Sequence, residues 1–179
     1  LALLLAVMLV RKPDWKVRPP IETLRATATV ITAFTIAHSL SLIAASLGWV
    51  HLPSRFVESM IALSIAYTAL ENILKPDVPW RFYLTFGFGL IHGLGFASTL
   101  AVLLPPSGVI VPLLCFNLGV ELGQLTIVVV ALPAFYMVAR AIGAHVYRRT
   151  LMPAISVGIF VLGAIWLLER ALQVTIIGM

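Results

Sequence analysis

The stretch "GFGLIHGLGFAS" (residues 87–98) places one histidine, His92, among four glycines in the middle of a long apolar run. A run of about 20 apolar residues is long enough to cross a bilayer as a helix. Glycine weakens a helix by about 0.5–1 kcal/mol relative to alanine, and an ionisable side chain inside a membrane needs a partner or a wet cavity. The stretch therefore predicts a membrane helix that packs closely on a neighbour and carries a polar site.

Composition places the whole chain in a membrane. Of its 179 residues, 61% are hydrophobic and 11% are charged, and the mean hydropathy is +1.07. Soluble domains average about 45–50% apolar and about 25% charged residues. The net charge of +5 does not indicate a nucleic-acid partner, because the charged residues fall between the apolar runs, as membrane topology requires. Cys115 is the single cysteine, so an intrachain disulfide and a CxxC metal motif are both excluded.

Apolar runs separated by proline and charged residues predict an all-α fold, a polytopic transmembrane helical bundle that forms a single domain over residues 1–179. We expect five full spans plus a truncated first helix. The opening run "LALLLAVMLV" has ten residues, about half of a bilayer crossing at about 1.5 Å per residue. We therefore expect the chain to begin partway through a helix, with further sequence upstream. The predicted ranges are 1–10 for the helix fragment and about 26–48, 55–74, 81–104, 109–136 and 153–172 for the spans.

The distribution of lysine and arginine predicts the orientation. Ten of the 12 such residues fall in the predicted connections after the first, third and fifth helices, and only Arg55 and Arg170 lie on the opposite side. Cytoplasmic loops of membrane proteins carry the excess of these residues. The first helix should therefore end in the cytoplasm, and the C-terminus should lie outside.

Three ionisable residues share one depth in the predicted spans. His38, His92 and Glu121 each lie close to the middle of a span, whereas Glu58 lies nearer the outer end, by about 10 Å at about 1.5 Å per residue. A charged side chain at mid-membrane costs at least about 2.5–3.5 kcal/mol on insertion scales. We therefore expect the three to face one another or a wet cavity.

Two glycine patterns suggest how these residues meet. "GLIHG" (89–93) and "GVELG" (119–123) are both GxxxG patterns on consecutive antiparallel helices, and each encloses one of the ionisable residues. GxxxG allows close approach of helices in lipid. We expect the two helices to pack together and to bring His92 to Glu121. The glycines assigned to this packing are Gly89, Gly93, Gly119 and Gly123.

Further polar patterns surround these residues. Asn117, Glu121 and Gln124 recur at i, i+4 and i+7 and form one stripe on a helix. The segments "FTIAHSLS" (34–41) and "FGLIHGLG" (88–95) share the pattern F-x-x-x-H, which suggests a parallel internal repeat with ligands near its interface.

Imidazole nitrogen and carboxylate oxygen together suit Ni, Zn, Co, Fe(II) or Mn. We predict a mid-membrane site with His38, His92 and Glu121 as metal ligands and Glu58 at its outer mouth. Asn117 and Gln124 would support the ligands by hydrogen bonding. One plainer alternative is that His38 and His92 only form hydrogen bonds between helices. Another is that the negative charge of Glu58 only stabilises a helix N-terminus. No Ser–His–Asp set or GxSxG motif is visible, so we assign no catalytic residues.

Four ordered segments resemble one family of bacterial membrane proteins. They are "TAFTIAHSLSL", "VESMIALSIAYTALEN", "FGFGLIHGLGFAS" and "FNLGVELGQ". In this order they are similar to the signatures of the second branch of the HupE/UreJ family, from about residue 32 to 124 and weakly to "WLLER" (166–170). The resemblance implies a multi-pass protein of the bacterial inner membrane and a nickel permease that serves hydrogenase or urease maturation. It also implies that a further histidine and a Gly-x-Asp-His motif precede Leu1.

The leading prediction is a membrane protein that binds a divalent transition metal, nickel or one of Zn, Co, Fe and Mn, and conducts it. Its partners would be the lipid bilayer, the metal ion and other membrane subunits. One alternative is an accessory subunit that packs in a larger membrane complex without transporting anything. The other is an intramembrane metal-dependent hydrolase in which Glu121 acts as general base. Metal-dependent uptake separates the first function from the other two.

Overall fold

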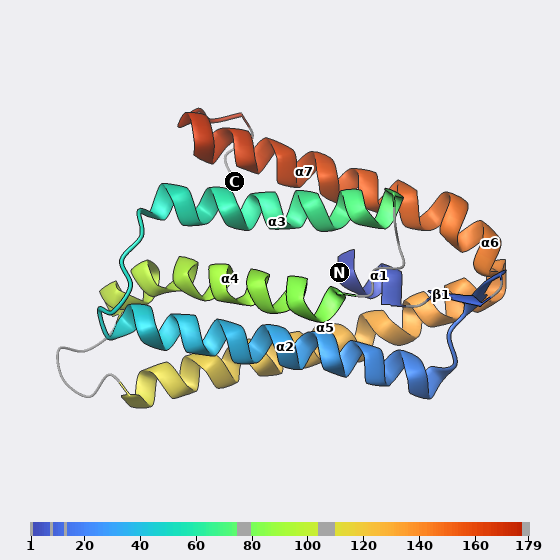
Figure 1. Ribbon diagram of the computed structural model, residues 1–179, viewed down its shortest axis with the longest axis horizontal. Coiled ribbons are helices and arrows are strands. Elements are labelled where there is room, and N and C mark those ends of the chain that lie inside the picture. Colours follow the sequence, from blue (N-terminus) through green and yellow to red (C-terminus); the bar gives the residue numbers. More distant parts are fainter. Residues whose placement is uncertain (1, 8, 13, 75–79, 104–109, 177–179) are drawn as a thin grey trace.

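Long apolar helices make up most of the chain (Figure 1). The computed structural model describes residues 2–7, 9–12, 14–74, 80–103 and 110–176. The elements in order are α1 (Ala2–Val7), β1 (Leu9–Lys12), β2 (Asp14–Val17), α2 (Pro20–Ser46), α3 (Ser54–Leu74), α4 (Arg81–Leu103), α5 (Ile110–Ile142), α6 (Ala144–Val146), the π-helix η1 (Tyr147–Leu151) and α7 (Met152–Leu172).

Four of these segments are long and apolar enough to cross a membrane: Pro20–Ser46, Ser54–Leu74, Val111–Ile142 and Ala144–Leu172. The predicted helical, multi-span class is therefore confirmed. α4 has 23 residues, a length of about 35 Å at about 1.5 Å per residue, but it is not among the four. The count of five full spans stays a prediction.

The chain before α2 differs from the prediction. α1 ends at Val7, short of the predicted end at residue 10, and a two-stranded antiparallel hairpin follows, with Leu9 opposite Val17. Valine and tryptophan favour strands, and the basic residues between them keep this segment out of an apolar helix. α2 then begins at Pro20, six residues before the predicted start, because proline suits the first turn of a helix.

The connection from α5 to α7 is also helical rather than a loop. α5 continues to Ile142, and Gly143 then adopts a φ of +81°, a conformation that glycine reaches without strain. α6 and η1 lead directly into α7, so the last candidate span begins at Ala144 rather than near residue 153.

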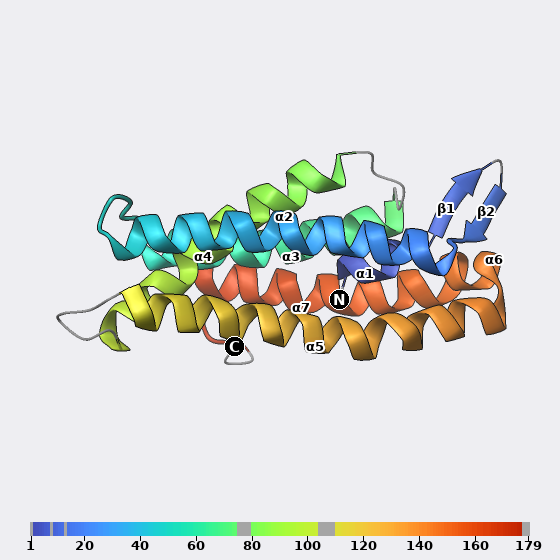
Figure 2. The ribbon, with the colours of Figure 1, turned by 90° about the horizontal axis from the view of Figure 1, so that it is seen from below.

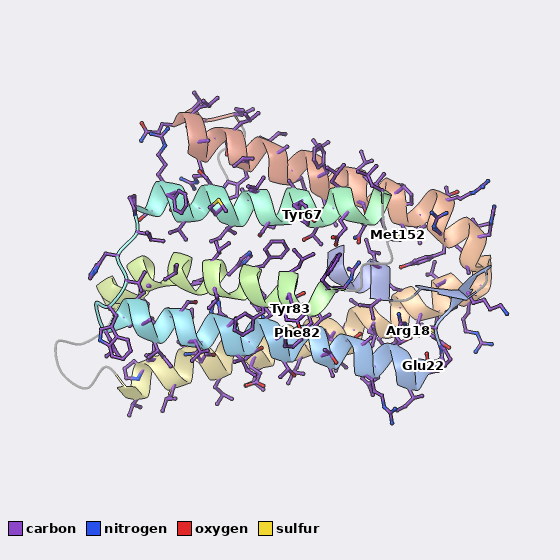
Figure 3. All side chains as sticks on the ribbon, in the orientation of Figure 1. Arg18, Glu22, Tyr67, Phe82, Tyr83 and Met152 are labelled. Carbon is purple, nitrogen blue, oxygen red and sulfur yellow. The ribbon has the colours of Figure 1, made fainter. Side chains whose placement is uncertain are left out.

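The helices pack as two close pairs. α2 lies along α4, and α3 lies along α7, while α3 also contacts α4 and so joins the pairs (Figures 1 and 2). α1 lies near the basic end of the bundle. There Leu5 is fully buried with Tyr147 and Met152. Met152, labelled in Figure 3, is the residue that begins α7. Between α3 and α4, the rings of Tyr67 and Phe88 meet edge to face at 6.2 Å.

α5 is the peripheral helix of this arrangement. Only 6% of its apolar, membrane-spanning stretch is buried inside the protein, compared with 33% of the corresponding stretch of α2. It has far fewer contacts with α2 than α4 has, and Figure 2 shows it along one side of the bundle. Lipid or another protein must therefore cover most of its surface.

Candidate metal site

The glycines of α4 bring it into close contact with α2. A Cβ atom added at Gly89 would lie 2.6 Å from the carbonyl oxygen of Phe34 and 2.8 Å from the Cβ of Ala37. One added at Gly93 would collide with the hydroxyl of Ser41 and the carbonyl group of His38. Real Cβ atoms do not approach other atoms this closely, so both positions need glycine. The residue numbers of the contacts rise together, so the two helices run parallel.

The structure corrects the predicted pairing of glycine patterns. Cβ atoms added at Gly119 and Gly123 would have no atom within 4 Å, so these glycines do not pack against α4. The glycine face of α4 is already occupied by α2. Helix geometry gives a second reason, because Glu121 is two residues from each glycine of its pattern. At about 100° per residue, a residue at i+2 points about 200° away, so Glu121 and these glycines cannot face the same neighbour.

His38 is buried at the interface between α2 and α4. Its side chain stacks on Phe34, with ring centroids 5.7 Å apart, and meets the edge of Phe96 at 5.8 Å. The residue is only 2% exposed, and in the described part of the chain neither ring nitrogen has a hydrogen-bond partner. A buried polar group without a partner costs about 1–3 kcal/mol. Such a group in a native protein calls for a ligand, an ion or a water.

His92 has a partner on a third helix. Its Nε2 lies 3.0 Å from the Oγ of Ser64 on α3. The same hydroxyl donates to the carbonyl oxygen of Ile61 at 2.7 Å. A serine hydroxyl has one proton to donate, so His92 must donate from Nε2 when both bonds are present. The lone pair then lies on Nδ1, which is the nitrogen free to bind a ligand.

The two histidines are neighbours across one aromatic ring. Phe34 stacks on His38 and meets His92 edge to face, with centroids 5.3 Å apart. Glu121 is exposed on α5 and does not join them. Over the ranges that the structure describes, no three His, Cys, Asp or Glu side chains form a group that could hold a metal ion. The structure thus brings together two of the predicted ligands, and the predicted cluster of three does not form.

The polar stripe on α5 contacts α2 instead of the histidines. Ser39 donates to the Oδ1 of Asn117 at 3.0 Å, and Thr35 donates to the Oε1 of Gln124 at 3.1 Å. Asn117 and Gln124 therefore fasten α5 to α2. Glu121 lies between them in the sequence but at the edge of this contact, where it remains exposed.

Glu58 lies at the end of the bundle where α3 begins. Its Oε2 is 2.9 Å from the Nε of Arg170 near the end of α7. Glu58 also lines a cavity of about 190 Å³ together with His51 and Ser54. His51 lies in a loop, where a histidine is usually solvated. Its position seven residues before Glu58, across a short turn, is the signal that could have identified it.

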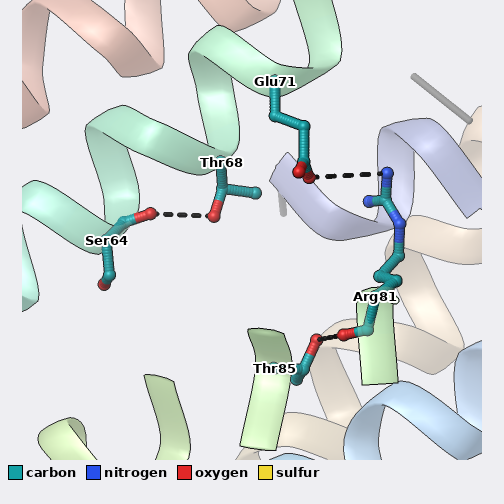
Figure 4. A network of polar contacts seen from close by, with 5 residues as sticks. All are labelled: Ser64, Thr68, Glu71, Arg81 and Thr85. Atoms are coloured by element: carbon teal, nitrogen blue, oxygen red, sulfur yellow. Dashed lines mark hydrogen bonds and ion pairs between the residues drawn. The ribbon is translucent and has the colours of Figure 1, made fainter. Parts of the chain in front are cut away.

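A second polar network joins α3 and α4 at the opposite end (Figure 4). The Nη2 of Arg81 lies 3.8 Å from the Oε2 of Glu71, and both side chains are almost buried. Thr85 donates to the carbonyl oxygen of Arg81, and Thr68 donates to that of Ser64. This ion pair holds the start of α4 against the end of α3.

Comparison with known proteins gives one match. The model of a family described as "HupE / UreJ protein" matches residues 1–170. No curated protein and no solved structure matches the chain. This match begins before and ends after the four segments, at about residues 32–124, that resemble the family in the sequence.

Proposed function

Because the chain belongs to the HupE/UreJ family, we propose that it is a membrane permease for a divalent transition metal, with nickel as the first candidate. The family is associated with nickel or cobalt transport or with an accessory role in it. The apolar helices support a place in a lipid bilayer. The proposal includes α4 as the fifth full span, the bacterial inner membrane as the location and the C-terminus outside.

The observation that carries the proposal is the buried imidazole of His38. Its two ring nitrogens have no hydrogen-bond partner in the described residues, and His92 lies beside it with Nδ1 available. Neutral imidazole is a common ligand for nickel, cobalt and zinc. We assign these two side chains as the ligands that the metal ion meets at mid-membrane.

A site with two protein ligands suits a transported metal ion better than a permanently bound one. Structural metal sites are closed by four protein ligands, whereas conduction requires binding that is weak enough for the ion to leave. With two imidazoles, the remaining positions on the metal would be held by water. Glu121 would add a third ligand only after a movement of α5, the helix with the least buried surface among the candidate spans.

An accessory role is the second candidate, and the exposed face of α5 favours it. This face carries large apolar residues such as Val129, which is 71% exposed, together with the exposed carboxylate of Glu121. A carboxylate at mid-membrane is costly in lipid, so a protein neighbour would stabilise it. Co-purification of a stable complex without metal uptake would support this role.

Uptake into proteoliposomes tests the proposal. The purified protein should accelerate entry of ⁶³Ni²⁺ over empty liposomes, and His38→Gln and His92→Gln should each reduce entry by at least about tenfold, since an amide is a poor ligand for nickel. His145→Gln is the control, because His145 is exposed in α6, away from both histidines. Uptake that both variants retain at the parent rate would overturn the proposal.

A further inference from the structure

A cavity opens where the turn between α2 and α3 meets α4. Its volume is about 190 Å³, and its polar walls come from His51, Ser54 and Glu58. One water needs only about 10–15 Å³ of such space, so the cavity holds several waters. It is therefore large enough for a divalent cation that keeps part of its hydration shell. We name it the outer cavity, because it lies at the end opposite the basic connections.

The donors on its walls match those assigned at mid-membrane. His51 supplies an imidazole and Glu58 a carboxylate, and this pair of ligand types favours nickel, cobalt and zinc over calcium or magnesium. Both line this cavity although they are seven residues apart in the sequence. His51 is exposed and Glu58 is partly exposed, so an ion from bulk water can reach both.

The cavity also reaches toward the buried histidines. Leu94 and Gly95 line it, and they are two and three residues from His92 on α4. At about 1.5 Å per residue, these positions lie about 3–4.5 Å from His92 along the helix axis. This wall of the cavity therefore lies within about one helix turn of the level of His92, whereas Glu58 lies six residues, about 9 Å, from Ser64, the partner of His92 on α3.

Arg170 already neutralises the carboxylate of this cavity. Its Nε lies 2.9 Å from the Oε2 of Glu58, and the two side chains are 43% and 33% exposed. Glu58 also lines a second cavity beyond this ion pair, together with Arg55, Glu169 and Arg170. Glu58 thus lies between the outer cavity and a cluster that contains two guanidinium groups. A metal ion and Arg170 compete for the same carboxylate.

We infer that His51 and Glu58 form a capture subsite for the transported metal ion at the outer face, and that Arg170 is the built-in cation that the metal displaces. This inference rests on the proposed permease function. The ion pair keeps the empty subsite neutral, and an entering dication takes over Glu58. The affinity of the capture subsite sets the metal concentration at which transport is half-maximal, whereas the mid-membrane histidines set the rate at which the ion passes.

Transport kinetics test the inference through the separate effects on KM and kcat. Glu58→Gln and His51→Gln should raise the KM for Ni²⁺ several-fold and leave kcat near the parent value. Arg170→Gln should lower KM by about 1.5-fold to fivefold, the factor that corresponds to an exposed ion pair. Arg55→Gln is the matched control. Arg55 lines the second cavity and carries the same charge as Arg170, but the ion pair with Glu58 is made by Arg170. The KM of Arg55→Gln should stay closer to that of the parent.

Equilibrium binding separates failure of this inference from failure of transport. A variant with both His38→Gln and His92→Gln should still bind one Ni²⁺ weakly by equilibrium dialysis, and adding Glu58→Gln should abolish that binding. This holds whether or not the parent protein transports nickel. No binding by the double variant, or an unchanged KM in Glu58→Gln and Arg170→Gln, would overturn the inference.

Discussion

Replacing Gly93 by alanine should disturb the contact that brings the two histidine-bearing helices together. The added methyl group would collide with the hydroxyl of Ser41 and the carbonyl group of His38. The carbonyl belongs to the backbone of α2 and cannot rotate away, so α2 and α4 must move apart. Forcing an extra carbon into a packed interface costs about 1–3 kcal/mol. Part of this cost is offset, because alanine favours a helix over glycine by about 1 kcal/mol.

Thermal unfolding in detergent measures the effect. For chains of about this length, 1 kcal/mol shifts the melting temperature by about 2–4 °C. An overpacking cost of about 1–3 kcal/mol therefore lowers it by about 2–12 °C before the offset. Gly93→Leu should lower it further, because the larger side chain meets the same backbone. Metal binding should fall in parallel, since His38 is the residue whose carbonyl is displaced.

Gly123→Ala is the matched control for this prediction. It makes the same chemical change in a membrane helix, but no atom lies within 4 Å of the added carbon. Its melting temperature should stay the same or rise slightly. If Gly93→Ala and Gly123→Ala have the same melting temperature as the parent, the close contact between α2 and α4 does not exist, and the geometry of the site fails with it.

Three further results follow from the site. Ser64→Ala removes the acceptor that fixes the ring of His92, and it should weaken nickel binding about tenfold, as loss of a ligand-orienting partner does in other metal sites, measured by dialysis. In a Glu58→Gln background, His38→Phe should weaken nickel binding at the mid-membrane histidines yet raise the melting temperature, because it removes buried polar atoms that have no protein partner among the described residues; a lower melting temperature would contradict the account of His38. Nickel binding should weaken as the pH is lowered, because protons compete for imidazole nitrogen, and binding that stays unchanged from about pH 7 to about pH 3 would exclude imidazole ligands.

The limits of α3 and α4 could be predicted from the sequence. The predicted range 55–74 compares with Ser54–Leu74 for α3, and 81–104 compares with Arg81–Leu103 for α4. Proline and charged residues mark these ends, and both disfavour continuation of a helix in lipid. Burial of His38 and the close packing of Gly93 also follow from the cost of polar groups and the use of glycine in membranes.

The partner of each helix could not be predicted in the same way. GxxxG shows that a helix approaches another closely, but it carries no information on which one. The glycines of the pattern at 89–93 contact α2, whereas a Cβ added at Gly119 or Gly123 would have no atom within 4 Å. Helix geometry could have excluded the meeting of Glu121 with a neighbour packed on Gly119, because residues at i and i+2 lie on opposite sides.

The structure of the basic connections between helices also could not be predicted. The first strand, Leu9–Lys12, begins inside the range predicted as the helix fragment 1–10, whereas the second strand, Asp14–Val17, and the helical turns from Ala144 to Leu151 lie in segments predicted as loops. Polar connections have no long apolar periodicity, so the sequence offers only weak signals for their structure. A loop histidine such as His51 is expected to be solvated, and only the folded turn brings it to the same cavity as Glu58.

The central claim is that His38 and His92 together bind the metal ion. X-ray absorption at the nickel edge of the purified, nickel-loaded protein tests it most directly, because scattering from imidazole rings reports how many histidines bind the metal. We expect two imidazoles per nickel in the parent and one in either His38→Gln or His92→Gln, with Glu58→Gln included to remove nickel from the outer cavity. An unchanged number of imidazoles in both variants, or no bound nickel in the parent, would contradict the account.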